Sequence, residues 1–341
     1  METTCKTDEK RGRIVNVTAN TCVRDLGQYV ESFILAAAPG TDLSGVRPED
    51  CTFENTAKHP AAGHESFGAW KTEAAGPVLT VSVDPFLYND TYQGSIVIDG
   101  ETISLSKADV DDMRVSVVDD FQPVTTENGL AYRLLVPESD GPLPLIVTFH
   151  GNGERGTDNY NQMVHNRLTT KWGEPESQAW YKCVVLGPQS NNSWSDDELK
   201  DIRGIIDRLI EEKIVDPARV YAYGMAAFQA TIRFSAMNAD LLAGVVSMIY
   251  WKKYTPDLTP LAQLPIWMVI AENDPTGESG VVKEAYQYLK EELHNEKMKC
   301  TIYSDEEMAS YGLYGGQLHW CWIPTLNNKE ISDWLFAQKK E

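Results

Sequence analysis

The sequence predicts an α/β fold, with a mainly parallel sheet flanked by helices that is preceded by a small all-β unit. Three observations predict it. Residues 1–118 contain short alternating apolar segments and no helical period. From about residue 120, apolar strands alternate with amphipathic helices, as in parallel sheets. Several of those strands are uniformly apolar, which is typical of strands buried on both faces. We therefore expect domains at residues 1–118 and 119–341.

The first half indicates a sandwich of short strands. The segments RIVNVTANTCV, YVESFILAAAP, GPVLTVSVDP and DMRVSVVDDF alternate apolar and polar positions. SIVIDGETISLS adds a hairpin signal, because Asp99-Gly100 is a favoured two-residue turn. The spacing predicts an immunoglobulin-like domain. Since no cluster of ionisable residues stands out, this half predicts no chemistry, and a binding role and a structural role both remain open.

The second half predicts a series of strands separated by helices. GLAYRLLVP, after a turn at Asn128-Gly129, is expected as an edge strand. PLPLIVTFHGNGE, KCVVLGPQ, RVYAYG, AGVVSMIY, PIWMVIAEND and KCTIYSD are the next strands. The segment SDDELKDIRGIIDRLIEEKIV has helical spacing with Ser195 as N-cap. In such sheets the ligand site lies beyond the carboxyl ends of the strands.

Charge and composition exclude some partners. The chain of 341 residues has a formal net charge of −20, so phosphate backbones and anionic membrane surfaces would repel it. A neutral or cationic small substrate, or a polysaccharide, is the expected partner. The N-terminal METTCKTDEKRGR has no apolar signal core, although a polar start also follows signal removal, so the compartment stays open. The six cysteines have no CxxC spacing, which argues against a zinc site.

The strand ends carry residues in a meaningful order. HGNGERGTDN follows one strand, YGMAAFQAT a later one, AENDPTGES the next but one, and YGGQLHWCW the last. A glycine-rich loop, a turn, an Asp and then a His is the order of the α/β-hydrolase fold. Residues 120–341 resemble bacterial serine esterases of the feruloyl-esterase and acetyl-xylan-esterase type, several of which have an immunoglobulin-like domain in front. The resemblance is carried by HGNGERGTDN, by DPARVYAYGM and by HWCWIPTLNNKEISDWLFAQKK.

This resemblance implies catalytic roles for Asp274 and His319, each of which also has a structural alternative. Asp274 ends an apolar strand and would orient and support an imidazolium at His319. A helix cap is the structural alternative for Asp274, and Asp305 or Glu306 is the fallback acid. For a lone histidine such as His319, a satisfied core position is the structural alternative, and chain order argues against it.

The oxyanion donors follow from the glycine loop and the turn. We expect the backbone N–H groups of Asn152 and Ala227 to face the developing charge. Trp194 and Trp320 are candidate substrate-binding residues, although tryptophans near a cleft also simply pack. Glu154 is the candidate carboxylate that would anchor a free amino terminus in a peptidase of the same fold. His150 is expected to be structural.

The turn departs from the G-x-S-x-G pattern of a nucleophile elbow. Gly224-Met225-Ala226-Ala227-Phe228 has Ala226 where the serine belongs and Phe228 where the second glycine belongs. A methyl group cannot attack a carbonyl, so this chain should be nearly inert by the serine mechanism. Ser235 is expected too far along the helix to substitute, and nothing positions Cys321 over the glycine loop.

The sequence therefore predicts a serine carboxylesterase acting on acetyl or hydroxycinnamoyl-type esters, with its nucleophile position occupied by Ala226. No cofactor and no metal are implied. One alternative is a natural pseudoenzyme that binds an ester or glycan without catalysis. Another is a peptidase of the same fold. The acyl group, the alcohol, the oligomeric state and the origin of Ala226 stay open.

Overall fold

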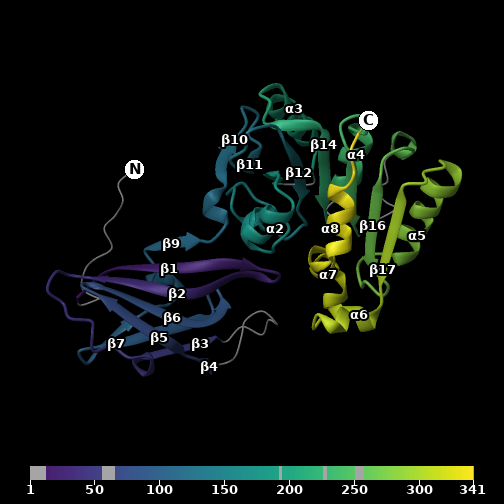
Figure 1. Ribbon diagram of the computed structural model, residues 1–341. Coiled ribbons are helices and arrows are strands. Elements are labelled where there is room, and N and C mark those ends of the chain that lie inside the picture. Colours follow the sequence, from purple (N-terminus) through teal and green to yellow (C-terminus); the bar gives the residue numbers. More distant parts are fainter. Residues whose placement is uncertain (1–12, 56–65, 192–193, 226–228, 250–256, 341) are drawn as a thin grey trace. The chain divides into compact units, whose positions relative to one another are not determined.

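The computed structural model describes residues 13–55, 66–191, 194–225, 229–249 and 257–340. The chain divides into two compact units, residues 1–119 and 120–341 (Figure 1). Each unit is described by itself below. The described part of both units contains no helix long and apolar enough to cross a membrane.

The first unit is built of β-strands. One sheet runs in the order β5-β6-β2-β1-β9 and another in the order β4-β3-β7-β8. Neighbouring strands pair antiparallel except β1 and β9, which are parallel. The strands are β1 (Ile14–Arg24), β2 (Gly27–Ala37), β3 (Cys51–Asn55), β4 (Ser66–Phe67), β5 (Ala69–Ala75), β6 (Val78–Leu87), β7 (Tyr92–Ile98), β8 (Glu101–Ser104) and β9 (Asp112–Val115). Short 3-10 turns occupy Pro48–Asp50, Lys107–Asp109 and Val118–Asp120.

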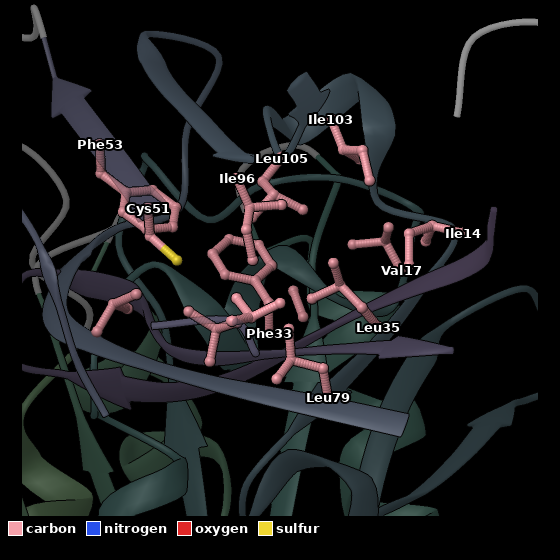
Figure 2. Packing of buried hydrophobic residues seen from close by; sticks show 14 of the residues in the cluster. Ile14, Val17, Phe33, Leu35, Cys51, Phe53, Leu79, Ile96, Ile103 and Leu105 are labelled. Carbon is pink, nitrogen blue, oxygen red and sulfur yellow. The ribbon is translucent and has the colours of Figure 1, made fainter. Parts of the chain in front are cut away.

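Side chains from both sheets share one apolar core (Figure 2). Phe33 of β2 stacks on Phe53 of β3, with ring centroids 5.6 Å apart. The predicted hairpin is present, because Ile98 pairs with Glu101 across Asp99 and Gly100. Both turn residues have positive φ, 51° and 81°, as a type I′ turn requires. The all-β prediction is confirmed, and the immunoglobulin-like assignment stays a prediction.

The second unit has a mainly parallel sheet in the order β10-β11-β13-β12-β14-β15-β16-β17. Only β11 runs antiparallel to its neighbours β10 and β13, among the pairs described. The strands are β10 (Gln122–Thr125), β11 (Ala131–Leu135), β12 (Leu143–Phe149), β13 (Val184–Gln189), β14 (Val215–Gly224), β15 (Gly244–Met248), β16 (Ile266–Ala271) and β17 (Met298–Tyr303).

Helices alternate with these strands and pack along the sheet (Figure 1). They are α1 (Asn161–Val164), α2 (Pro175–Trp180), α3 (Asp196–Glu211), α4 (Ala230–Met237), α5 (Ser279–Gln287), α6 (Asp305–Ser310), α7 (Trp322–Asn327) and α8 (Lys329–Phe336). Single turns lie at Thr170–Gly173, Thr259–Leu261 and Gly315–His319, and a π-helical turn at Tyr288–Glu292. This mainly parallel sheet with flanking helices confirms the predicted fold class.

The helix cap and the buried strands of this unit agree with the sequence-based predictions, whereas the predicted edge strand does not. Ser195 caps α3, since its side chain accepts the Glu198 N–H. Every residue of the uniformly apolar strands β12, β13, β15 and β16 is buried, as expected. The prediction that GLAYRLLVP is an edge strand is wrong, because β11 lies between β10 and β13. The edge is β10, a short strand whose Pro123 has no N–H to donate to a further strand.

Candidate active site

The chemistry-bearing residues follow the ends of four of the parallel strands. The glycine-rich loop of residues 150–160 follows β12, and Gly224 and Met225 lead out of β14. Asp274 follows β16, and His319 ends the 3-10 turn that comes after β17. Because these strands are parallel, their carboxyl ends lie at one edge of the sheet. The fold therefore gathers these residues at that edge.

The structure brings together His319 and Asp274, which are 45 positions apart in the sequence. The His319 Nδ1 lies 2.9 Å from Oδ2 and 3.0 Å from Oδ1 of Asp274. The imidazole is 26% exposed, whereas the Asp274 side chain is fully buried. A carboxylate at this distance holds the ring with its Nδ1 proton inward and leaves Nε2 to exchange protons with a substrate or nucleophile. The two residues thus have the geometry of a base and its orienting acid.

Asp274 is held ionised by a fixed set of donors. Its Oδ1 accepts the backbone N–H groups of Thr276 and Gly277, each at 2.8 Å. Burial opposes the charged form, but the hydrogen bonds from His319, Gly277 and Thr276 outweigh it and lower the pKa of Asp274 below its usual value. The N-cap of α5 is Glu278 rather than Asp274. The carboxylate therefore faces the imidazole and does not cap a helix.

Thr276 is a site residue that sequence analysis missed. Its hydroxyl lies 2.7 Å from Nδ1 of His319 and 3.1 Å from Oδ1 of Asp274. It therefore touches both members of the pair from the same turn that supplies the backbone donors. The sequence signal that could have identified Thr276 is its hydroxyl group two positions after Asp274. In a short turn that begins at an Asp, the residue two positions later lies beside the carboxylate.

The fallback acids lie elsewhere. Asp305 and Glu306 are exposed residues in the first turn of α6, which Ser304 caps. Asp305 accepts a hydrogen bond from Asn273. The hydrogen bonds of His319 within the described residues go to Asp274 and Thr276.

The glycine loop is held by its carbonyl groups. Each of five consecutive carbonyls, from residue 150 to residue 154, accepts a hydrogen bond from a side chain. The donors are Trp194 Nε1 to His150 at 3.3 Å, His150 Nδ1 to Gly151 at 2.7 Å, Arg155 Nε to Asn152 at 3.0 Å, His165 Nδ1 to Gly153 at 3.2 Å and Gln189 Nε2 to Glu154 at 3.2 Å.

This arrangement fixes the direction of the predicted oxyanion donor. In a trans peptide the N–H points opposite to the carbonyl of the preceding residue. Since the Gly151 carbonyl is bound to the His150 ring, the Asn152 N–H points away from that ring. The Ser190 N–H binds His150 Nε2 at 2.9 Å, so the Nδ1-protonated neutral ring is fixed. Burial lowers the pKa of His150 to about 4, which agrees with the structural role predicted for it.

The elbow is described only at its edges. Gly224 ends β14, and a side chain there would meet the Phe149 carbonyl at 2.7 Å, which favours glycine. The Met225 N–H binds that same carbonyl at 2.9 Å and ties this segment to the end of β12. Residues 226–228 lie outside the described residues, so the nucleophile position Ala226 and the predicted donor Ala227 are not placed. The chain resumes at Gln229, with φ of 59° at the N-cap of α4.

The predicted substrate-binding residues fall into different environments. The Trp194 ring is fully buried against Phe149 and His150, with centroids 5.3 and 4.6 Å away. The ring packs inside the loop, and its predicted contact with substrate stays a prediction. Trp320 is half-buried, and its ring centroid is 6.0 Å from that of Trp322, whose edge meets His319.

Glu154 and the possible replacement nucleophiles are all buried. Glu154 is 9% exposed and its Oε1 accepts the Asn166 amide at 2.8 Å, so it offers no exposed carboxylate to a free amino terminus. The Ser235 hydroxyl donates to the Thr231 carbonyl inside α4. Burial raises the pKa of the fully buried Cys321 thiol, which disfavours the reactive thiolate.

Comparisons with known proteins find the fold but no named family. No family model and no curated protein matches the chain. A solved structure of a thermostable esterase is similar with a TM-score of 0.76 at 24% identity, covering 96% of this chain and 100% of that one. The structure of Est1E from Butyrivibrio proteoclasticus is a weaker likeness, with a TM-score of 0.45 at 12% identity, covering 64% of this chain and 100% of that one. The first likeness and the strand order establish an α/β-hydrolase fold preceded by an all-β region.

Within the described residues, no group of three or more His, Cys, Asp or Glu side chains is arranged to hold a metal ion. The expectation that the chain needs no metal or cofactor stays a prediction.

Proposed function

We propose that this chain carries the active site of a serine carboxylesterase whose nucleophile position is occupied by Ala226. The observation that carries the proposal is the contact between His319 and Asp274, with Nδ1 2.9 Å from the buried Oδ2. A partly exposed imidazole on a buried carboxylate is the arrangement that a general base requires. The pair lies at the same edge of the sheet as the glycine loop, which follows the carboxyl end of β12.

Each residue has a stated role in the serine form. His319 Nε2 takes the proton of the serine hydroxyl as its oxygen attacks the ester carbonyl. Asp274 keeps Nδ1 protonated and supports the imidazolium that forms. The N–H groups of Asn152 and Ala227 stabilise the oxyanion. His319 then protonates the leaving alcohol, and water releases the acyl group by the same steps.

The substrate class follows from the resemblance and from the surroundings of His319. We propose an acetyl or hydroxycinnamoyl-type ester, carried on a small alcohol or on a polysaccharide. Trp320 and Trp322 supply aromatic surface beside the base, which suits an aryl or sugar ring. The net charge of −20 favours neutral or cationic ligands over nucleic acids and anionic membranes.

The second candidate function is binding without catalysis, which Ala226 itself favours. In that case the site holds an ester or a glycan and does not turn it over. The peptidase alternative has less support, because Glu154 is buried and bound to Asn166. A site for a free amino terminus would need an accessible carboxylate.

The test compares the chain with its Ala226→Ser variant on acetyl esters, feruloyl esters and aminoacyl amides. We expect the serine variant to hydrolyse at least one ester, with a rate roughly 10⁶-fold above the alanine form. The matched control is Ala226→Ser combined with His319→Ala, which should return the rate to that of the alanine form. Hydrolysis of amides but not esters would favour the peptidase.

A further outcome decides against the esterase. If both forms fold alike, as judged by circular dichroism and thermal melting, and neither hydrolyses any ester, the proposed function fails. Calorimetric binding of the same esters to the alanine form then tests the binding protein directly.

A further inference from the structure

The second unit contains a cavity of about 570 Å³ that the proposed mechanism does not use. Its described lining includes none of His319, Asp274 and Thr276. Four segments form its walls: the turn before β11, the middle of the glycine loop, the end of β13 and the first turns of α3. A cavity of this size lies within the range of small-molecule sites, so it is a candidate for a second binding site.

The cavity lies at the same edge of the sheet as the candidate base. Its lining includes Gln189, which ends β13 and pairs with Ala131 at the start of β11. Gln189 Nε2 donates to the carbonyl of Glu154 in the glycine loop at 3.2 Å. Since β13 is the parallel neighbour of β12, the carboxyl ends of both strands lie at one edge. A ligand in the cavity would therefore lie beside the loop that contains the predicted oxyanion donor.

The uncharged polar groups of the lining can both donate and accept hydrogen bonds. Asn128 and Asn191 contribute amides, and Thr157 and Ser195 contribute hydroxyls. An amide presents two N–H donors and a carbonyl acceptor, and a hydroxyl acts in both ways. The hydroxyl groups of a sugar have the same dual character. This lining therefore matches a polyhydroxylated ligand.

The charged side chains of the lining each have a partner within it. The pairs, with the donor first, are Lys200 and Asp197 at 2.9 Å, the Ser195 backbone N–H and Glu198 at 2.6 Å, and the Asn128 amide and Asp201 at 2.8 Å. The positive end of the α3 dipole offsets the acids further. A cationic ligand would meet compensated carboxylates, and an anionic ligand would meet three acids and one lysine. The lining therefore favours a neutral ligand.

We propose that this cavity binds a neutral sugar unit in the alcohol part of an acylated glycan. The Asp201 carboxylate and the Asn128 amide, which hold each other, accept from and donate to neighbouring sugar hydroxyls, and Thr157 and Asn191 bind from the opposite segments. No aromatic side chain is among the described lining residues, so hydrogen bonds supply the affinity and the complex is weak. The inference rests on the proposed function for the identity of the substrate, whereas sugar binding itself needs no catalysis.

The binding test uses the chain as it stands, with Ala226 in place. Calorimetry measures its Kd for xylotetraose, and putrescine serves as the cationic comparison. Asp201→Ala removes the carboxylate that holds Asn128. Asp207→Ala is the matched control, because Asp207 is also a hydrogen-bonded acid of α3, paired with Arg203 at 2.8 Å, and does not line the cavity.

We expect the chain to bind xylotetraose in the millimolar range and not to bind putrescine. Asp201→Ala should weaken sugar binding by at least about 10-fold, the value of one hydrogen bond to a charged group, and Asp207→Ala should leave it unchanged. The proposal is overturned if the chain binds putrescine but not the sugar. Equal sugar affinity in Asp201→Ala and its parent would place the sugar elsewhere and overturn it as well.

The kinetic test uses the Ala226→Ser variant with acetylated xylotetraose and para-nitrophenyl acetate. We expect Asp201→Ala to raise KM for the glycan ester by about 10-fold with kcat unchanged, because the sugar is held equally in the ground state and the transition state. The aryl ester has no sugar, so its kcat and KM should not change. An equal loss on both esters would reveal a general structural effect and contradict the proposal.

The two tests separate this inference from the proposed function. If the serine variant hydrolyses the aryl ester while the alanine chain binds no xylotetraose, the sugar site fails and the esterase stands. If the alanine chain binds xylotetraose through Asp201 while the serine variant hydrolyses no ester, the sugar site stands and the esterase fails.

Discussion

Replacing Asp274 by asparagine in the Ala226→Ser variant tests the tautomer that the site imposes on His319. Oδ1 of Asp274 accepts two backbone N–H groups at 2.8 Å, from Thr276 and Gly277. These donors belong to the turn and cannot reverse. The asparagine will therefore place its oxygen there and its NH₂ group at the Oδ2 position, 2.9 Å from the His319 Nδ1.

The magnitude follows from this geometry. An NH₂ group facing Nδ1 favours the tautomer in which Nδ1 has no proton and Nε2 carries it. A protonated Nε2 cannot accept the proton of the serine, so the general base is lost while the shape of the site is kept. Such a substitution in a triad lowers kcat by roughly 10⁴-fold, which corresponds to about 5.4 kcal/mol.

The assay is the pH dependence of kcat and KM for the preferred ester. Asp305→Asn is the matched control, because Asp305 was the fallback acid and is exposed on α6. We expect Asp274→Asn to lower kcat about 10⁴-fold with little change in KM, and Asp305→Asn to leave both near the parent. A loss below tenfold for Asp274→Asn, or a larger loss for Asp305→Asn, would refute the assignment.

Two other predictions concern residues around this pair. Thr276→Val removes the hydroxyl that touches His319 and Asp274 and keeps the backbone N–H donor. We expect kcat of the Ala226→Ser variant to fall about fivefold, because one hydrogen bond contributes a net free energy of about 1 kcal/mol. Thr276→Ser, which keeps a hydroxyl, should restore kcat. An unchanged kcat would show that the hydroxyl is dispensable. Burial lowers the pKa of His150 from 6.5 to about 4. Between pH 6.5 and pH 4 the unfolded chain therefore binds more protons than the folded chain. As the pH falls through this range, the free energy of unfolding should decrease by up to about 3 kcal/mol. Urea unfolding of the alanine chain at several pH values should show this slope, and His150→Gln should flatten it; parallel slopes would contradict the neutral buried ring.

The fold was largely predictable because its periodicities are strong. Uniformly apolar strands followed by polar loops identified the parallel sheet, and Asp99-Gly100 identified a hairpin that the structure contains. The short edge strand β10 was missed because four residues with a proline give almost no periodic signal. That omission made β11 look like the edge.

The site was predictable in its parts and less so in its contacts. The sequence order led to Asp274 and His319, whose hydrogen bond the structure then describes. It could not tell which way Trp194 faces, since an aromatic ring suits a core and a cleft equally well. The ring is buried because residue 194 has φ of 53° and its indole N–H binds the His150 carbonyl. Such a contact depends on tertiary packing and leaves no periodic trace.

Two features of the described part of the site bear on the proposal for position 226. Ile249, a β-branched residue, has φ of 59° and lies 3.0 Å from where a side chain on Gly277 would be, beside the buried Asp274. Backbone strain of this kind costs about 1–3 kcal/mol, and the unpaired Oε2 of Glu154 adds a further cost. Mutations that relieve such costs are common and accumulate when no function opposes them. A chain that had long ceased to catalyse would be expected to have relaxed these features along with the serine. Their joint presence supports the proposal that Ala226 occupies the nucleophile position of a serine carboxylesterase site.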